Sequence, residues 1–167
     1  MTLGWHIIAE FEQCSRSSID NIEYVEKHLN ESARIAGATI VKSVFHKFAP
    51  QGVSGVVVIE ESHFAIHTWP EHNYAAVDMF TCSEYMDYDK ALVYLKEKFG
   101  CKVFKHQVIK RGENVVTQTA IDKGYDYVLC GHIHQPIIKK ITHNNKTISY
   151  LNSGDWVENL TALEYNN

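Results

Sequence analysis

The segment most informative about the fold of this chain is Val53-Ser-Gly-Val-Val-Val-Ile-Glu-Glu-Ser-His-Phe-Ala-Ile-His-Thr-Trp69. It holds two runs rich in β-branched and aromatic residues, 53–59 and 63–69, which are separated by acidic residues. Such runs on either side of a short polar segment are typical of a β-hairpin. A turn signal, Pro50-Gln-Gly52, precedes the hairpin, and Pro70 ends it. We therefore predict two antiparallel strands over this stretch.

The sequence on both sides of the hairpin predicts an α+β fold. Apolar residues recur at helical spacing over 22–36, after the N-cap candidates Ser17 and Ser18. A second helical pattern opens at Asp87 and closes at Gly100. We expect a two-layer sandwich in which these two helices cover one face of an antiparallel sheet. The further strands of that sheet are predicted at residues 3–11, 38–48, 74–82 and 101–109.

Composition indicates an ordinary globular protein. Hydrophobic residues make up 45% of the 167 residues and charged residues 22%, and the net charge is -4. This charge gives no general electrostatic reason to bind nucleic acid. No apolar run approaches the roughly 20 residues that span a bilayer, and the N-terminus has no basic leader, which argues against a signal peptide. We expect no nucleic-acid or membrane partner.

The cysteines bear on the cellular compartment. Cys14, Cys82, Cys101 and Cys130 are widely scattered and form no CxxC pair. Spacing therefore predicts neither a zinc site nor a disulfide framework. Free thiols fit a reducing compartment, and we predict a cytoplasmic protein.

The hairpin brings together residue types that can move protons. If Glu60 and Glu61 form a two-residue turn, Ile59 pairs with Ser62, and the same register places Ser54 opposite His67. A hydroxyl that faces an imidazole is suited to proton transfer. Yet a serine at a hairpin corner is usually a turn residue, and a single strand histidine is usually structural. Spacing alone leaves these two interpretations open.

A family resemblance changes that balance. Val44-Phe-His-Lys-Phe-Ala-Pro-Gln-Gly-Val-Ser-Gly-Val-Val-Val-Ile-Glu-Glu-Ser-His-Phe-Ala-Ile-His-Thr-Trp-Pro-Glu71, followed by Tyr74-Ala-Ala-Val-Asp-Met-Phe-Thr-Cys82, closely resembles the prokaryotic S-adenosylmethionine decarboxylases. The likeness extends from Leu3 through Gly112, about two-thirds of the chain. These are self-processing enzymes that make the aminopropyl donor for spermidine synthesis.

The resemblance implies a cofactor made from the chain itself. The Ser62 hydroxyl attacks the Glu61 carbonyl, and the chain is cleaved between the two residues, leaving a pyruvoyl group at Ser62. Ser54 helps to stabilise the oxyanion at Glu61, and His67 moves the elimination proton. The pyruvoyl carbonyl then forms a Schiff base with the substrate amine and accepts electrons as carbon dioxide leaves. Cys82 matches the acid that returns a proton to the substrate.

The resemblance also implies a substrate pocket and an assembly. Glu71 matches the residue that binds the ribose hydroxyls of S-adenosylmethionine. Phe48 and Phe64 lie where adenine contacts are expected, and an aromatic face favours a cationic sulfonium. The family usually builds this site at a dimer interface, so a homodimer of cleaved protomers is implied.

Some positions depart from the family pattern. Trp5 replaces a common basic residue, and Glu12-Gln13 and His72-Asn73 each replace a frequent Tyr-Gly. Because some relatives decarboxylate arginine or ornithine, a pyruvoyl-dependent decarboxylase of another amino acid stays an alternative. A further alternative is an unprocessed, non-catalytic homologue, but a silent homologue has no need to retain Ser54, Ser62, His67 and Cys82.

Residues 113–167 lie beyond the usual end of this family, and we predict a domain boundary there, after residues 1–112. Gly124-Tyr-Asp-Tyr-Val-Leu-Cys-Gly-His-Ile-His-Gln-Pro136 and Asn152-Ser-Gly-Asp-Trp-Val-Glu158 resemble the end of calcineurin-like metallophosphoesterases. His132 and His134 match two late metal ligands, but the upstream ligand motifs are missing, so we predict no metal site and no phosphoesterase activity. We expect a small α/β appendage with a helix over 115–123, a strand over 127–130 and a hairpin about 143–146.

Overall fold

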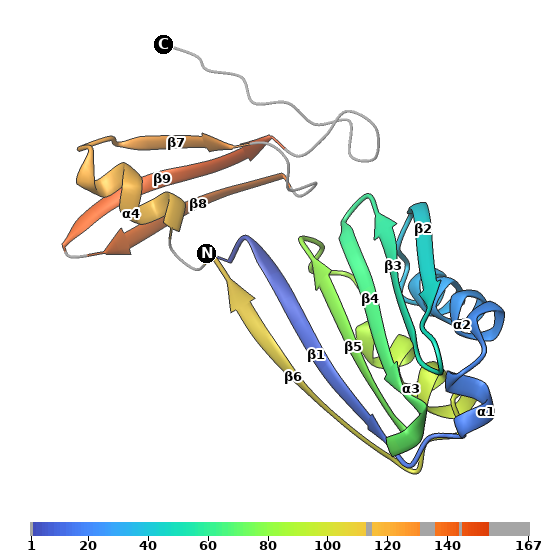
Figure 1. Cartoon of the computed structure of the whole chain (residues 1–167). Coiled ribbons are helices and arrows are strands. Elements are labelled where there is room, and N and C mark those ends of the chain that lie inside the picture. The colour runs from blue at the N-terminus through green and yellow to red at the C-terminus, as the bar shows by residue number, and fades with distance from the viewer. Residues whose placement is uncertain (1, 113–114, 131–135, 144, 154–167) are drawn as a thin grey trace. The chain divides into compact units, whose positions relative to one another are not determined.

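The predicted hairpin lies inside a six-stranded sheet in the computed structural model, which describes residues 2–112, 115–130, 136–143 and 145–153. Strands β3 (Val53–Ile59) and β4 (Ser62–Trp69) are antiparallel, and Ser54 pairs with His67 as Ile59 pairs with Ser62. The predicted register is therefore confirmed. The strand order is β2-β3-β4-β5-β1-β6 (Figure 1). The other four strands are β1 (Gly4–Glu12), β2 (Ile40–Lys47), β5 (Tyr74–Thr81) and β6 (Val103–Arg111).

Two main helices lie against one face of this sheet (Figure 1), which confirms the two-layer α+β prediction. They are α2 (Ile22–Ile35) and α3 (Tyr88–Lys98), and a short helix α1 (Arg16–Ile19) precedes α2. The predicted N-cap serines were wrong, because Ser17 and Ser18 lie inside α1. The side chain of Asn21 caps α2 instead, accepting a hydrogen bond from Tyr24 N–H, as Asp87 caps α3.

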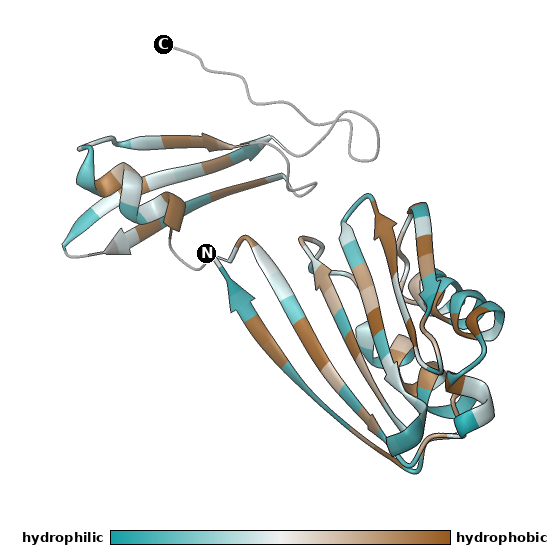
Figure 2. Cartoon of the chain, in the orientation of Figure 1, coloured by the Kyte–Doolittle hydropathy of each residue, from teal (hydrophilic) through white to brown (hydrophobic). Residues whose placement is uncertain are grey.

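The hydrophobic core lies between the helices and the sheet. Hydrophobic residues recur along the strands and on the helices (Figure 2). Along β5 buried residues alternate with partly exposed ones, as expected of a strand with one covered face. We call the other side, opposite the helices, the open face. The largest fully buried core side chains are Phe11, Phe64, Phe99, Ile7, Ile19, Leu29, Ile66, Met79, Leu92 and Leu95.

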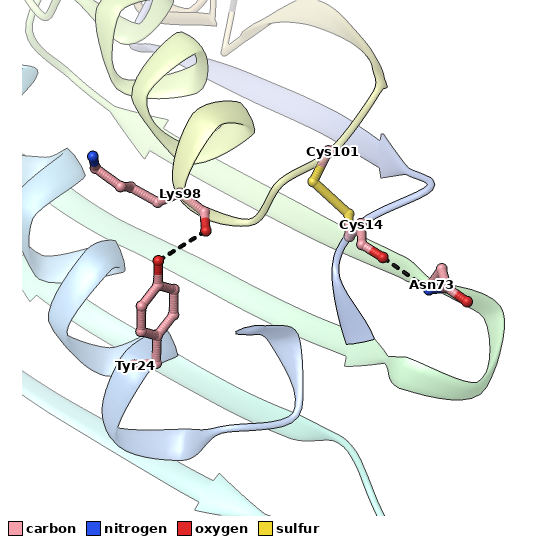
Figure 3. The surroundings of a disulfide bond; sticks show 5 residues. All are labelled: Cys14, Tyr24, Asn73, Lys98 and Cys101. Carbon is pink, nitrogen blue, oxygen red and sulfur yellow. Dashed lines mark hydrogen bonds between the residues drawn. A yellow bond between two sulfur atoms is a disulfide. The ribbon is translucent and has the colours of Figure 1, made fainter. Parts of the chain in front are cut away.

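Cys14 and Cys101 form a disulfide (Figure 3), which corrects the prediction from cysteine spacing. Cys14 follows β1 and Cys101 precedes β6. Spacing failed because Cys14 and Cys101, 87 positions apart in the sequence, are brought together by the neighbouring strands β1 and β6. The prediction of a reducing compartment assumed free thiols, and Cys14 and Cys101 are not free. Cys82 and Cys130 are free.

Two departures from the family pattern occur where the backbone is in the left-handed region. Gln13 has φ +55° and Asn73 has φ +51°, both in the left-handed region, where glycine is the usual residue. Asparagine tolerates this region better than most residues. The Asn73 side chain also donates a hydrogen bond to the Cys14 carbonyl at 2.8 Å, a contact that glycine lacks. Asn73 thus adopts the backbone conformation that glycine would adopt and adds a hydrogen bond.

His28 links the two helices and predicts an acid sensitivity of the fold. Its Nδ1 lies 2.7 Å from the Tyr94 hydroxyl, and burial lowers the pKa of His28 below its usual 6.5. The folded state then binds fewer protons than the unfolded chain, so stability falls as pH drops below 6.5.

We expect His28→Gln to lose less thermal stability than wild type between pH 7.5 and 5.5. Scanning calorimetry at both pH values measures this, and His72→Gln, at an exposed histidine, is the control. An equal loss in wild type and His28→Gln would contradict the prediction.

The C-terminal residues belong to a second compact unit, formed by Met1–Leu3 with Lys110–Asn167, whereas Gly4–Ile109 form the first. Its helix α4 (Val115–Asp122), strand β7 (Tyr127–Cys130) and hairpin β8 (Pro136–His143) and β9 (Lys146–Ser153) confirm the predicted elements. The sheet order is β7-β9-β8, and Ala120, Ile121 and Ile148 form a small core. His132 and His134 lie outside the described residues.

Candidate active site

The corner between β3 and β4 holds Ser62 in an unusual backbone conformation. Its φ is +146°, a region that almost only glycine occupies. The Ser62 hydroxyl lies 3.3 Å from Nδ1 of His63, whose ring stacks on Phe80. Strain of this kind costs about 1–3 kcal/mol and persists only where the surrounding structure enforces it. The sequence could not show this strain, because serine is ordinary at a turn.

The peptide bond before Ser62 is already polarised. The Glu61 carbonyl accepts a hydrogen bond from the backbone N–H of Cys82 at 3.1 Å. The β4–β5 register, in which Ser62 pairs with Thr81, brings Cys82 to this place. A backbone donor aimed at a carbonyl stabilises negative charge that develops on its oxygen. The family resemblance assigns oxyanion stabilisation to Ser54 alone and does not reveal this backbone donor. The register of Ser62 with Thr81 is the signal that would have found it.

The segment before β2 fixes the same corner from the other side. The Thr39 backbone N–H donates to the Glu61 carboxylate at 3.2 Å, and the Thr39 carbonyl accepts from Glu60 N–H at 2.9 Å. Both turn residues are therefore held by one residue of the neighbouring segment. This arrangement limits how far the corner can relax.

Cys82 lies beside the corner with a protonated side chain at neutral pH. Burial raises the pKa of the Cys82 thiol, and the nearby Glu61 carboxylate raises it further. A raised pKa suits a proton donor and disfavours a thiolate nucleophile. Ser62 and Cys82 thus form one group of predicted site residues, with Glu61 between them.

A second group lies at the opposite end of the hairpin. The Ser54 hydroxyl is 3.1 Å from Nδ1 of His67 on the open face. Glu71 follows β4 in the short 3-10 helix η1 (Pro70–His72), and its carboxylate accepts a hydrogen bond from Gln51 at 3.0 Å. Phe48 is 49% exposed beyond the end of β2. This second group therefore offers a hydroxyl–imidazole pair, a carboxylate and an exposed aromatic ring.

The two groups do not meet within one chain. Ser62 and His67 are five residues apart on the same strand, which corresponds to about 16 Å at 3.3 Å per residue. Ser54 is equally far from the corner along β3. Neither the Ser54 hydroxyl nor the His67 imidazole reaches the Glu61 carbonyl of its own chain.

One predicted substrate contact is wrong for a structural reason. Phe64 is fully buried, with 0% exposure, and belongs to the core under the helices. Its ring has no surface to offer to a ligand. The apolar strand pattern is compatible with Phe64 either as a substrate contact or as a core residue. Phe64 is a core residue because it lies on the side of the sheet that the helices cover.

A separate hollow is lined by residues other than the predicted site residues. It has a volume of about 870 Å³, lies near the start of α1 and α2, and is lined by Arg16, Asp20 and Lys47 among others. Within the described ranges, no three His, Cys, Asp or Glu side chains are placed to hold a metal ion. No helix described here is long and apolar enough to cross a membrane.

Comparison with known proteins gives a consistent result for the first two-thirds of the chain. The sequence model of S-adenosylmethionine decarboxylase matches residues 5–112. The chain is 57% identical over 106 residues to the S-adenosylmethionine decarboxylase proenzyme of Fervidobacterium nodosum, covering 64% of this chain and 74% of that protein. The corresponding Thermotoga maritima proenzyme is 52% identical over 101 residues, covering 60% and 78%. The crystal structure of the Aquifex aeolicus adenosylmethionine decarboxylase superposes with a TM-score of 0.61 at 36% identity, covering 66% of this chain and 92% of that one.

Proposed function

The chain belongs to the S-adenosylmethionine decarboxylase family, and we propose that it cleaves itself between Glu61 and Ser62 and decarboxylates S-adenosylmethionine with the group made from Ser62. The observation that carries the proposal is the corner itself. Ser62 is held at φ +146°, next to a Glu61 carbonyl that accepts a hydrogen bond from Cys82 N–H. A nucleophile, a polarised carbonyl and a strained backbone occur at one peptide bond.

The proposed cleavage rearranges bonds without an external reagent other than water. The Ser62 oxygen bonds to the Glu61 carbonyl carbon as that carbon releases the Ser62 nitrogen, which gives an ester. A base then removes the Ser62 α-proton and the ester carboxylate leaves, so that one chain ends at Glu61. Water hydrolyses the resulting dehydroalanine to a pyruvoyl group and ammonia. The Cys82 N–H stabilises the negative charge on the Glu61 oxygen during the first step.

The residues around the corner fit a pyruvoyl group at position 62. Bound there, the group supplies a carbonyl that condenses with the substrate amine and accepts electrons as carbon dioxide leaves. The Cys82 thiol, kept protonated by burial, is next to this position and can donate a proton to the substrate α-carbon. The backbone N–H and the thiol of Cys82 therefore serve different steps.

The distance between the two groups supports a homodimer in which each site draws on both chains. Processing needs a base near Ser62, and the Ser54–His67 pair is about 16 Å away in the same chain. In a two-fold symmetric dimer, a contact of one residue with another is repeated in the reverse sense. Two copies that meet through their open faces bring His67 of each to Ser62 of the other. The result is two equivalent sites.

The proposed dimer also suggests where the substrate binds. Phe48 and Glu71 lie at the Ser54–His67 end, so they would reach the Ser62 site from the partner chain. The Glu71 carboxylate suits the ribose hydroxyls, and the exposed Phe48 ring suits adenine or the sulfonium. We propose that residues 113–167 form an appended domain without phosphoesterase activity.

Cys82→Ala separates the two steps of the proposed function. The variant retains the backbone N–H at the Glu61 carbonyl, so we expect cleavage to proceed. Loss of the thiol proton donor should lower the decarboxylation rate by roughly 100- to 10,000-fold. Release of labelled carbon dioxide from carboxyl-labelled S-adenosylmethionine measures the rate, and intact mass measures cleavage.

Substrate choice is tested in the same assay with arginine and ornithine. Wild type should release carbon dioxide from S-adenosylmethionine far faster than from either amino acid. The matched control for Cys82→Ala is Ser83→Ala, which removes a hydroxyl next to Cys82. This control should keep both self-cleavage and decarboxylation. Faster turnover of arginine or ornithine would replace the proposed substrate, and full activity in Cys82→Ala would remove the proposed donor.

A further inference from the structure

Cleavage at Glu61 would divide the six-stranded sheet between two interleaved chains. Strands β1, β2 and β3 belong to residues 1–61, and strands β4, β5 and β6 belong to the remainder. In the sheet order β2-β3-β4-β5-β1-β6, strand β1 lies between β5 and β6 (Figure 1). One strand of the N-terminal chain is thus bordered on both sides by strands of the C-terminal chain.

Several hydrogen bonds near the end of β1 join these two parts of the chain. Cys14 N–H donates to the Asn73 carbonyl at 2.8 Å, and the Asn73 side chain donates to the Cys14 carbonyl at 2.8 Å (Figure 3). Ser15 N–H donates to the Phe99 carbonyl at 2.8 Å. Nearby, the Tyr24 hydroxyl donates to the Lys98 carbonyl at 3.0 Å. In each pair, one residue precedes the cleavage point and the other follows it.

Resting on the self-cleavage proposed above, we propose that the Cys14–Cys101 disulfide covalently joins the two chains of the processed protein. Cys14 is in residues 1–61 and Cys101 is in residues 62–167, so the bond restores the continuity that cleavage removes. Without it, the N-terminal chain is held by non-covalent contacts only. With it, re-insertion of β1 is an intramolecular event with a high effective concentration.

Burial protects this link. Cys14 is 2% and Cys101 is 6% exposed, and reduction of a disulfide requires a thiolate to reach one of its sulfurs. The described free cysteines, Cys82 and Cys130, are both partly exposed, and neither is the partner of Cys14 or Cys101. The link therefore persists in the folded protein while the other thiols stay available for alkylation.

The test is the mass of the purified, processed protein under denaturing conditions, after free thiols are blocked with N-ethylmaleimide. Without reductant we expect one species that contains residues 1–61 and 62–167 together. In denaturant, dithiothreitol transfers two electrons and two protons to the disulfide and is itself oxidised to a cyclic disulfide. Two separate chains should then appear. Cys101→Ser and Cys14→Ser should each give separate chains without reductant, whereas Cys130→Ser should stay linked.

The outcomes distinguish this inference from the proposed function. Separate wild-type chains before any reduction would overturn the disulfide link and leave self-cleavage intact. A single full-length chain that persists after reduction would show that no cleavage has occurred, which overturns both. The wild-type measurement decides even where a cysteine variant does not fold.

Discussion

Ser62→Ala is expected to leave the chain in one piece and to reduce decarboxylation by about a thousandfold or more, as is typical when a covalent catalytic group is removed. Alanine has no hydroxyl to attack the Glu61 carbonyl, and it has no oxygen from which an ester can form. The wild type should instead give chains of residues 1–61 and 62–167, the second one beginning with a pyruvoyl group. Intact mass after reduction measures both.

Glu60→Ala is the matched control for this experiment. Glu60 occupies the same turn, and its backbone N–H contact to the Thr39 carbonyl is independent of its side chain. We therefore expect the control to be cleaved at about the wild-type rate. A wild-type chain that stays whole on incubation would contradict self-processing and favour a non-catalytic homologue. Cleavage of Ser62→Ala would show that Ser62 is not the nucleophile.

Two inactive variants should restore cleavage when they are produced together. His67→Ala lacks the proposed base, and Ser62→Ala lacks the nucleophile, so neither should be cleaved alone. A mixed dimer contains one site with both lesions and one site with neither. In the intact site, Ser62 of the His67→Ala chain meets His67 of the Ser62→Ala chain. With random pairing, about half of the His67→Ala chains should be cleaved.

Intact mass separates the two variants, because the substitutions change the masses of the chains differently. The Ser62→Ala chain must remain whole in the mixture, which provides an internal control. Ser54→Ala in place of His67→Ala tests the other member of the pair in the same way. If affinity tags show that mixed dimers form and yet no chain is cleaved, the site is not shared between protomers. Rapid cleavage of His67→Ala alone would remove His67 from the reaction.

Most helices and strands, and the pairing within the hairpin, could be predicted from residues close together in the sequence, although α1 and the Asn21 cap of α2 were missed. A two-residue turn at Glu60-Glu61 fixes which residues of β3 and β4 face each other, because it makes Ile59 pair with Ser62 and sets every pair beyond them. Ser54 and His67 could thus be placed opposite each other before the fold was known. The caps at Asp87 and the helix that follows are equally local, since they depend on residues within one turn.

Features that join distant segments of the chain depend on its tertiary structure. Cys14 meets Cys101 because β1 inserts beside β6, and no spacing rule encodes that order of strands. Phe64 is a core residue because its side of the sheet carries the helices. The Cys82 N–H reaches the Glu61 carbonyl through the β4–β5 register, and the strain at Ser62 follows from contacts on both sides of the corner. Local patterns indicate which segments become helices and strands. Long-range contacts require the chain to lose the entropy of closing a loop, and they depend on the order of all the strands.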